Sequence, residues 1–503
     1  MNHLIWFKRD LRTEDNEALA RAASQGTLIC LYIYEPDVIG AEDYDAAHLR
    51  FTNQCLVDLR ERLRELGGEL VIRMGDAVSV LQSLHKEYGF GVLHSHQETG
   101  NDITFRRDLT VKAWAREHNV EWREYLQHGV FRRLSDRNGW SGRWNELMRR
   151  PMWDEPDTIN CVPMRESGSI REPAVFGLTE RQRIHVQVGG MIEGHRTLDE
   201  FLSLRGQNYR FEMSSPLSAV TSCSRLSPHL AYGSLSMRMI LQMTEARQQR
   251  LRASRRMNRS KGDGWLDSLA SFSKRLRWHC HFMQKLESQP SIEFENMARV
   301  YDGMRENHFR QSFYEAWCAG ETGYPMVDAC MRSLVATGWL NFRMRAMLMS
   351  FASYHLWLHW RPTALFLARQ FVDYEPGIHY SQAQMQSGTT GINSVRIYSP
   401  IKQVIDQDPE GDFIRHWVPE LAGVPSEFLP QPELMPLDVQ QAAGCIIGVD
   451  YPKPIVEHKK AVAAAKKRIY GIRRQKGARD EARDVFVRHG SRRGPMRRGR
   501  PSG

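Results

Sequence analysis

Three arginines stand in a segment of the chain that is otherwise apolar. Residues 321–345 read ETGYPMVDACMRSLVATGWLNFRMR and carry Arg332, Arg343 and Arg345 among Met, Leu, Ala and Trp residues. An arginine within a mostly apolar helix is costly unless an anion meets its guanidinium group. A phosphate-bearing cofactor held in a helical pocket would supply that anion, so this segment predicts a cofactor site.

A serine-containing turn is a second candidate for anion binding. The turn consists of Cys223, Ser224, Arg225, Leu226 and Ser227, and an apolar helical pattern follows it. The two serines can cap that helix, and exposed amides at a helix N-terminus attract anions. The turn therefore predicts either a phosphate cradle or an ordinary helix cap.

The bulk composition excludes several classes of protein. At 503 residues, with 41% hydrophobic and 25% charged residues, the chain is long enough for two or more domains. No apolar run approaches a membrane span, and the N-terminus MNHLIWFKRDLR lacks the pattern of a secretory signal. Eight cysteines stand singly, so neither disulfides nor a metal site are expected. We expect a cytoplasmic protein without membrane contact.

Positive charge is concentrated at the C-terminus. Residues 459–503 hold 16 Lys or Arg against 3 Asp or Glu, whereas the whole chain has a formal net charge of +10. The rest of the chain is therefore slightly acidic. The composition of residues 471–503 predicts a basic, disordered tail, which could aid solubility or make non-specific phosphate contacts.

Short β-rich runs alternate with helical patterns over residues 1–135. The runs begin near residues 3, 27, 69, 91 and 121. Their alternation with helices predicts an α/β domain with a doubly wound parallel sheet. Residues 136–195 contain four prolines and are predicted to form a connector, and residues 196–470 a helical domain. The basic run 246–263 is either a solvated helix face or a phosphate-contacting surface.

Five segments together resemble the DNA photolyases and cryptochromes. The segments are WFKRDLRTEDNEAL (6–19), SRLSPHLAYGSLSMR (224–238), TGYPMVDACMRSL (322–334), DPEGDFIRHWVPEL (408–421) and YPKPIVEHKKA (451–461). They occur in the family's order, and the resemblance extends from residue 2 to about residue 468. It implies that the α/β domain is an antenna domain and that the helical domain is an all-α FAD-binding domain.

The resemblance also implies how FAD would be held. Arg345 and Asp373 match a charge pair beside the flavin ring, and Glu375 stands where the family usually has Asp. His379 occupies the position that faces flavin N5. It either exchanges a proton with the flavin, because imidazole titrates near neutral pH, or is an ordinary core histidine. The expected FAD-binding set is Tyr209, Cys223, Ser224, Arg225, Leu226, Ser227, Arg275, His279, Arg345, Asp373, Tyr374, Glu375 and His379.

The residues that would meet a DNA lesion depart from the family's pattern. Trp278 matches a tryptophan that can stack on a flipped pyrimidine pair. Arg275 replaces the family's carboxylate, and His279 replaces an arginine. Asn341 is displaced by one position from the family's asparagine. The expected catalytic set is Trp278, Asn341 and His379.

The resemblance extends to electron transfer and light harvesting. Of the family's three relay tryptophans, only the middle one has a match, Trp360, and the other positions hold Ala383 and Asn307. Candidate substitutes are Tyr380, Trp357, Trp317 and Tyr374. Residues 94–101 (HSHQETGN) resemble the loop that contacts an antenna pigment, which would be folate, deazaflavin or a second flavin.

Two main functions follow from the resemblance. One is light-driven repair of pyrimidine dimers in DNA by electron transfer from reduced FAD, carried out by a monomeric deoxyribodipyrimidine photo-lyase. The alternative is a cryptochrome-type blue-light photoreceptor, whose C-terminal segment is released in light. A third hypothesis is a nucleic-acid-binding protein that keeps FAD as structure only. The retained FAD positions and Trp278 favour repair.

Overall fold

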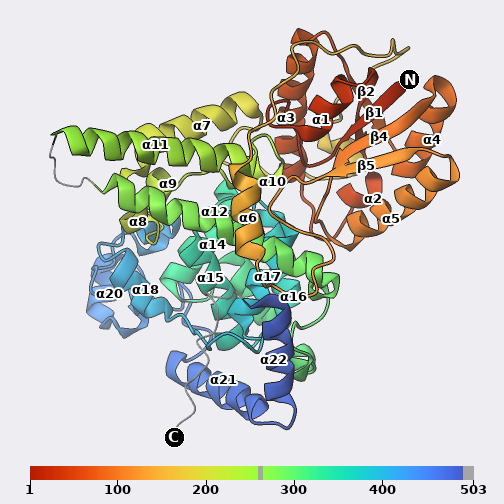
Figure 1. The fold of residues 1–503 in the computed structure, drawn as a ribbon. Helices are drawn as coiled ribbons and strands as arrows, with labels where there is room; N and C mark the ends of the chain where they lie inside the picture. Colours follow the sequence, from red (N-terminus) through yellow and green to blue (C-terminus); the bar gives the residue numbers. More distant parts are fainter. Residues whose placement is uncertain (259–263, 491–503) are drawn as a thin grey trace, which may run out of the picture.

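Alternating side chains of the first strand explain the layers of the N-terminal domain. In the computed structural model, which describes residues 1–258 and 264–490, Leu4 and Trp6 pack into one hydrophobic cluster and Ile5 and Phe7 into another. Successive side chains of a strand point to opposite faces of its sheet. Both faces are therefore buried, one beneath α1 and α3 and the other beneath α4 and α5 (Figure 1).

The five strands are parallel and lie in the order β3-β2-β1-β4-β5. Their bounds are β1 Asn2–Phe7, β2 Thr27–Tyr34, β3 Leu70–Met74, β4 Phe90–His96 and β5 Glu121–Tyr125. The helices between them are α1 Glu17–Ala23, α2 Pro36–Ile39, α3 Ala46–Glu65, α4 Ala77–Tyr88 and α5 Asp102–Glu117. This arrangement confirms the predicted doubly wound sheet. The strand order reverses at β1, where such sheets form a ligand crevice at the carboxyl ends of the strands.

The segment expected to be a connector, residues 136–195, contains a helix that its sequence did not predict. Helix α6, Trp140–Arg149, buries Trp140, Trp144 and Met148, which share one face because they are four residues apart. This face packs into a hydrophobic cluster of the helical domain. The prolines after residue 150 misled the prediction because they follow α6 and do not interrupt it.

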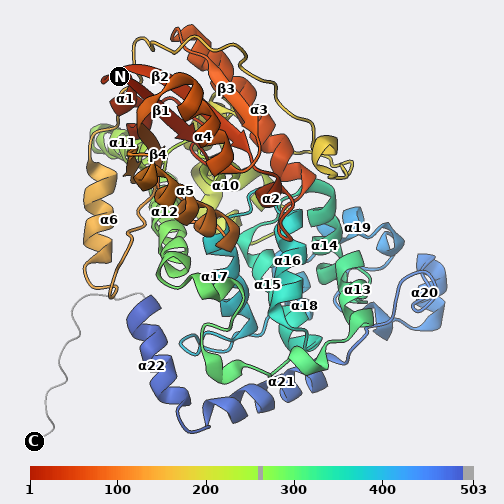
Figure 2. The same ribbon diagram turned by 90° about the vertical axis from the view of Figure 1, so that its right-hand side faces the viewer.

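The second domain is helical, as predicted, and the sheet domain lies above it (Figure 2). Its longer helices are α7 Met191–Ser203, α11 Met237–Asn258, α12 Trp265–Ser288, α13 Gln311–Ala319, α14 Pro325–Thr337, α15 Phe342–Ser350, α16 Trp360–Gln370, α17 Pro376–Ser387, α18 Pro400–Gln407, α21 His458–Arg473 and α22 Ala478–His489. Its shorter helices are α8 Tyr209–Glu212, α9 Ala219–Ser222, α10 Ser227–Ala231, α19 Asp412–Trp417 and α20 Leu437–Ala443. A π-helical turn, η6, spans Phe351–His355. None of the helices described is long and apolar enough to cross a membrane.

Part of the predicted disordered tail is helical. Helix α22 buries Ala478, Val485 and His489, and its side chains meet α12 and the residues around Arg299. These buried side chains outweigh the charge of the segment, which is what the composition emphasised. The remainder of the tail, residues 491–503, lies outside the described residues, as do residues 259–263 of the basic run.

Candidate functional site

A cavity of about 250 Å³ lies between α15, α16 and α17 in the helical domain. Apolar side chains such as Met349, Leu367 and Phe371 form much of its wall. Its polar lining consists of Ser227, Arg345, Asp373, Glu375, His379, Gln382 and Gln386. We call this space the central cavity. Its wall is mostly hydrophobic and carries a few polar groups, which is typical of small-molecule and cofactor sites.

A two-pronged ion pair marks one side of the central cavity. Arg345 donates from Nη1 and Nη2 to the two carboxylate oxygens of Asp373, each at 2.9 Å. Burial would raise the pKa of Asp373, but the Arg345 guanidinium outweighs it, and the pKa lies below its ordinary value. The Ser227 hydroxyl also bonds this carboxylate. The pair that the resemblance implied is therefore present and charged at neutral pH.

His379 is held in one orientation at the cavity wall. Its Nε2 lies 2.8 Å from the carbonyl oxygen of Ala364, so Nε2–H donates and Nδ1 is left as an acceptor. Burial lowers the pKa of His379 to about 4. The imidazole was expected to titrate near neutral pH. In the structure its pKa is lower, because burial disfavours the charged ring.

Glu375 is the acid whose pKa lies near neutrality instead. Its side chain is buried, and burial raises its pKa to about 7 although Arg9 lies 3.9 Å away. Its Oε1 atom has no hydrogen-bond partner among the described residues, and neither does either polar atom of the Gln382 amide. Tyr374 also lines the cavity, and its hydroxyl donates to Asp43.

These groups fit the heterocyclic ring of FAD. A buried carboxyl oxygen of Glu375 and both polar atoms of the Gln382 amide offer donors and acceptors that nothing in the described chain satisfies, and Nδ1 of His379 is a further acceptor at the wall. Unsatisfied buried polar groups are rare in folded proteins and each calls for a reason. A planar ring with both donors and acceptors along its edge would satisfy them, and Arg345 would face any negative charge on it.

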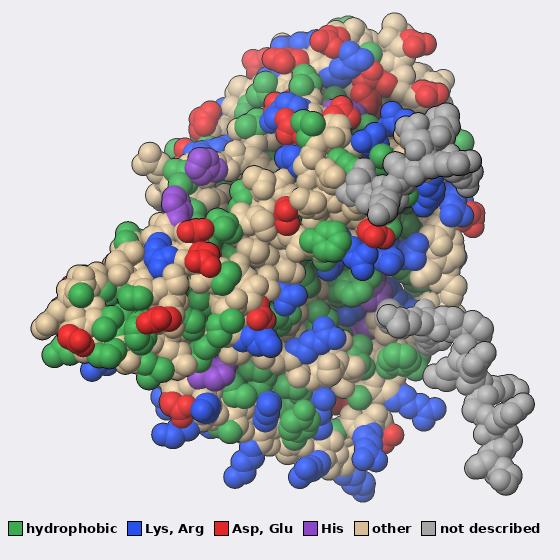
Figure 3. Space-filling view, turned by 90° about the vertical axis from the view of Figure 1, so that its left-hand side faces the viewer, with side chains coloured by type: hydrophobic (Ala, Val, Ile, Leu, Met, Phe, Trp, Pro, Cys, Tyr) green, Lys and Arg blue, Asp and Glu red, His purple; other side chains and the backbone are tan. Residues whose placement is uncertain are grey.

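A second cavity of about 360 Å³ adjoins the first and shares Phe342, Ile378 and Gln382 with it. Trp278 lines this space with 50% of its surface exposed, and the Arg275 guanidinium lies 5.6 Å from its ring. We call this space the mouth. Tyr209, Cys223, Arg275 and His279 of the expected FAD set line the mouth and not the central cavity. The face of the molecule in Figure 3 carries Lys and Arg side chains beside hydrophobic ones near its middle.

The serine-containing turn does not cap its helix as expected. The N-cap of α10 is Leu226, and no side chain caps this helix. The Arg225 backbone has a left-handed φ of 62°, and its guanidinium stacks on Trp339 at 3.9 Å. Ser224 interacts only weakly with the Leu226 amide, at 3.5 Å. Of the five turn residues, the structure brings Ser227 to the central cavity and Cys223 to the mouth.

Asn341 lies in a different place from the other expected catalytic residues. It is buried at the N-cap of α15, and its amide donates to the carbonyl oxygens of Met213 and Ser214 at 3.1 and 2.8 Å. It lines neither the central cavity nor the mouth. The one-residue displacement turns this side chain toward the backbone of the segment before α9, where it supports the mouth from behind.

The three arginines that drew attention in the sequence have three different surroundings. Arg345 meets Asp373, and Arg332 bonds Glu420 at 2.9 Å, away from both cavities. Arg343 lines the mouth, and its Nε has no partner among the described residues. One arginine thus serves the central cavity, one the mouth and one the packing of α14.

Aromatic side chains connect the central cavity with Trp360. The rings of Tyr374 and Tyr380 are 6.5 Å apart, and those of Tyr380 and Trp360 are 6.4 Å apart. Trp360 is fully buried and donates to Asn296 at 2.8 Å. Of the suggested substitutes, Tyr380 and Tyr374 lie on this path, whereas Trp317 packs against Phe366.

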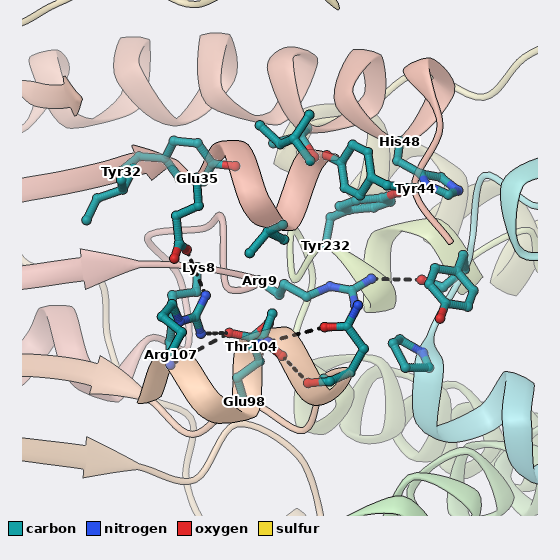
Figure 4. Close-up of a pocket in the computed structure, with 18 of the residues that line it drawn as sticks. Lys8, Arg9, Tyr32, Glu35, Tyr44, His48, Glu98, Thr104, Arg107 and Tyr232 are labelled. Carbon is teal, nitrogen blue, oxygen red and sulfur yellow. Dashed lines mark hydrogen bonds and ion pairs between the residues drawn. The ribbon is translucent and has the colours of Figure 1, made fainter. Parts of the chain in front are cut away.

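The crevice at the carboxyl ends of the strands is filled with ion pairs (Figure 4). Arg107 of α5 lies 2.8 Å from Glu35, 2.6 Å from Glu98 and 2.9 Å from Asp108. Lys8 joins two of these carboxylates, 3.7 Å from Glu98 and 3.4 Å from Asp108. The space that remains is about 100 Å³, compared with about 250 Å³ in the central cavity. The predicted antenna pigment would therefore have to displace some of these ion pairs to enter the crevice.

Comparison with known proteins accounts for both domains. Residues 3–135 match the model of the DNA photolyase family, and residues 272–471 match that of the FAD binding domain of DNA photolyase. The chain belongs to the photolyase/cryptochrome family. Its helical domain is thus an FAD-binding domain, which agrees with the unsatisfied polar groups of the central cavity.

The similar proteins include photolyases as well as cryptochromes. A cryptochrome DASH from Gloeobacter violaceus is 28% identical over 495 residues, which cover 92% of this chain and 94% of the relative. The crystal structure of a class III photolyase from Agrobacterium tumefaciens has a TM-score of 0.81 at 25% identity and covers 94% of this chain and 98% of its own. An archaeal photolyase from Sulfolobus tokodaii, solved with two FAD molecules, has a TM-score of 0.74 at 25% identity, with 94% and 100% covered.

Proposed function

We propose that this protein repairs pyrimidine dimers in DNA with electrons from light-excited, reduced FAD. The proposal is supported by family membership and by the polar groups of the central cavity that lack partners. The observation that carries it is the contact between the two cavities. Phe342, Ile378 and Gln382 line both, so a base in the mouth would meet the cofactor across a single layer of side chains.

Each side chain of the site has a stated task in this proposal. FAD, when bound, supplies the electron. Arg345 and Asp373 would hold its ring, and the charge of Arg345 would favour the reduced, anionic form. Gln382 and Glu375 would bond the ring edge, and the Nδ1 atom of His379 would accept a hydrogen bond.

The mouth would hold the lesion. Trp278 offers an exposed aromatic face for a flipped base, and Phe342 is 42% exposed beside it. Arg275 and Arg343 carry positive charge at the same opening and would meet backbone phosphates. Since Arg275 occupies the place of a carboxylate in relatives, this mouth should rely more on phosphate contacts than on a carboxylate bond to the base.

Activity on a defined lesion tests the proposal. The purified protein, loaded with FAD and reduced, should remove cyclobutane dimers from an oligonucleotide under blue light and not in the dark. Trp278→Ala should weaken binding to the dimer roughly tenfold, because stacking of a base on an aromatic ring contributes about 1–3 kcal/mol. Phe105→Ala, which removes an aromatic of similar exposure (47%) from α5, should bind the oligonucleotide as the wild type does. If the number of dimers stayed unchanged under light in both single-stranded and duplex DNA, the repair proposal would be contradicted.

A light-signalling function is favoured by one observation, the docking of α22 on the body. His489 bonds Gln289 at 2.7 Å, and Glu481 bonds the amide of Val300 at 2.8 Å. A photoreceptor needs such a segment to bind differently in the two states of its flavin. Faster proteolysis between residues 473 and 489 in light than in the dark would support signalling, and identical digestion in both would count against it.

A further inference from the structure

A hollow of about 640 Å³ opens on the surface beside α21, apart from the two cavities of the site. Residues 307–313 and the end of η6 form one wall, and the first half of α21 forms the other. It shares no lining residue with the central cavity or the mouth. We call it the α21 hollow. In Figure 2, α21 runs along the lower edge of the helical domain.

The α21 hollow is strongly basic. Arg310, Lys460 and Arg468 line it together with His308. Among the described residues, neither Arg310 nor Arg468 has an ion pair with a carboxylate. The one acid in its lining is Glu457, whose carboxylate accepts the amides of Lys459 and Lys460 at the start of α21 and lies 3.9 Å from Nζ of Lys460, so the unpaired charge is that of Arg310 and Arg468. The free positive charge suits an anion with several oxygens.

Aromatic rings line the same hollow. Phe309 and Phe313 stand on one wall, and Trp357 stands where η6 ends. The Trp357 backbone has a left-handed φ of 55°, which is strained for a bulky side chain. Strained residues and π-helical turns occur preferentially at ligand sites, because function justifies their cost. Planar faces beside free cations suit a planar ring that carries phosphate.

A buried arginine adds to the positive charge behind the hollow. Arg305 is 1% exposed, and its guanidinium lies 4.5 Å from the Trp357 ring, while that of Arg468 lies 4.6 Å from the same ring. Its Nε donates to the carbonyl of Ser353, but Nη1 and Nη2 have no partner among the described residues. Burial lowers the pKa of Arg305 to about 10, so the group is still charged at neutral pH. A buried charge of this kind is costly without a nearby anion.

We propose that the α21 hollow binds a phosphorylated planar ligand of the nucleotide class. The ring would lie against the partly buried Phe309, because Trp357 is only 8% exposed and its ring already contacts two guanidinium groups. The phosphates would meet Arg310, Lys460 and Arg468. The volume lies within the range that is usual for sites of this kind. The same chemistry is offered by a free nucleotide and by the end of a single nucleic-acid strand. This binding requires neither flavin reduction nor light, so it does not depend on the proposed repair activity.

Calorimetric titration of the FAD-loaded protein in the dark, in a phosphate-free buffer, tests the proposal with ADP as the probe. ADP should bind at least roughly tenfold more tightly than adenosine and than inorganic pyrophosphate, since the site contacts both ring and phosphate. The double variant Arg310→Gln/Arg468→Gln should weaken ADP binding at least roughly tenfold, because it removes two phosphate contacts. Lys86→Gln, an exposed lysine on α4 in the sheet domain, should leave it unchanged.

A short single-stranded oligonucleotide separates the two sources of the ligand. If the oligonucleotide binds more tightly than ADP and the double variant weakens its binding to the same extent, the proposal is supported and the ligand is a strand end. Trp357→Phe, which keeps an aromatic ring and the fold, should retain most of the ADP affinity. The proposal is overturned if ADP produces no heat at millimolar concentration, if pyrophosphate binds as tightly as ADP, or if the double variant binds ADP like the wild type.

Discussion

The central cavity and the crevice of the sheet domain are the two candidate pigment sites of this molecule, yet their charged side chains are arranged in opposite ways. In the central cavity Arg345 pairs closely with Asp373, whereas Glu375 has only a long ion pair with Arg9 at 3.9 Å, and Glu375 and Gln382 have atoms without a hydrogen-bond partner among the described residues. In the crevice, Arg107 is surrounded by three carboxylates within 2.9 Å. The first site is incomplete by itself, and the second is satisfied from within.

This difference in the pairing of buried polar groups indicates which of the two sites binds a cofactor. Unpaired buried polar groups lower the free energy of binding a ligand that satisfies them, whereas a completed ion network must be broken before a ligand can enter. The volumes agree, at about 250 Å³ for the central cavity and about 100 Å³ for the crevice. We therefore expect FAD in the helical domain and no pigment in the sheet domain.

Removing the centre of the crevice network should have the largest effect. Arg107→Met leaves Glu35, Glu98 and Asp108 buried with only the longer contacts of Lys8 and Arg132, and it should lower the free energy of unfolding by about 3–5 kcal/mol. Arg106→Met is the matched control, because that neighbour pairs with Asp102 while 76% of its side chain is exposed. It should cost under about 1 kcal/mol. Denaturant unfolding of both variants measures these changes. Equal losses of unfolding free energy in the two variants would show that the ion-pair network does not hold the crevice together.

Glu375 should give the central cavity a pH dependence. Its pKa of about 7 in the folded state exceeds its ordinary value of 4.5, so the folded protein holds this proton more tightly than the unfolded chain. The resulting stability is complete below pH 4.5 and is lost as the pH rises through 7. Relative to Glu375→Gln, the cofactor-free wild type should lose up to about 3 kcal/mol across this window.

Thermal unfolding of the two proteins between pH 4.5 and pH 8 measures this loss. Glu61→Gln, at an exposed position of α3, should follow the wild type throughout. Parallel curves for the wild type and Glu375→Gln would mean that this carboxyl is already ionised in the folded state, and the contrast between the cavity and the crevice would weaken.

Breaking the ion pair of the central cavity should release the cofactor. Arg345→Met removes the guanidinium that would face the reduced ring, so the Kd for FAD should rise at least roughly tenfold, a cost of about 1.4 kcal/mol. Arg332→Met, from the same stretch of sequence but paired with Glu420 outside both cavities, should bind FAD like the wild type. Flavin fluorescence titration of the two apoproteins measures both Kd values. Equal affinities of the two variants for FAD would show that Arg345 does not bind the cofactor.

Much of the fold was readable in the sequence because it depends on short-range periodicity. The five β-rich runs became β1 to β5, and the helical patterns between them became helices such as α3 and α5. Helix α6 was missed because prolines dominate its neighbourhood, and α22 because its charges conceal three buried side chains. In both cases, tertiary burial decided the structure, and local composition did not show it.

The site was predicted less evenly, because burial and long-range pairing leave no local signal. The pair of Arg345 and Asp373 was predicted from the family resemblance and is present. The neutral state of His379 follows from burial, which no spacing reveals. Arg107 was missed because one of its partners, Glu35, lies 72 residues away in the chain. The acidic ends of two parallel strands facing a basic residue on α5 were the signal that could have revealed it.

The stoichiometry of bound pigment tests the account most directly. The native protein, purified gently in the dark, should show the absorption spectrum of flavin alone and release one FAD per chain on denaturation. A colourless protein that takes up no added FAD would contradict the central claim. A second flavin, a folate or a deazaflavin released in equal amount would show instead that the ion pairs of the crevice give way to a pigment.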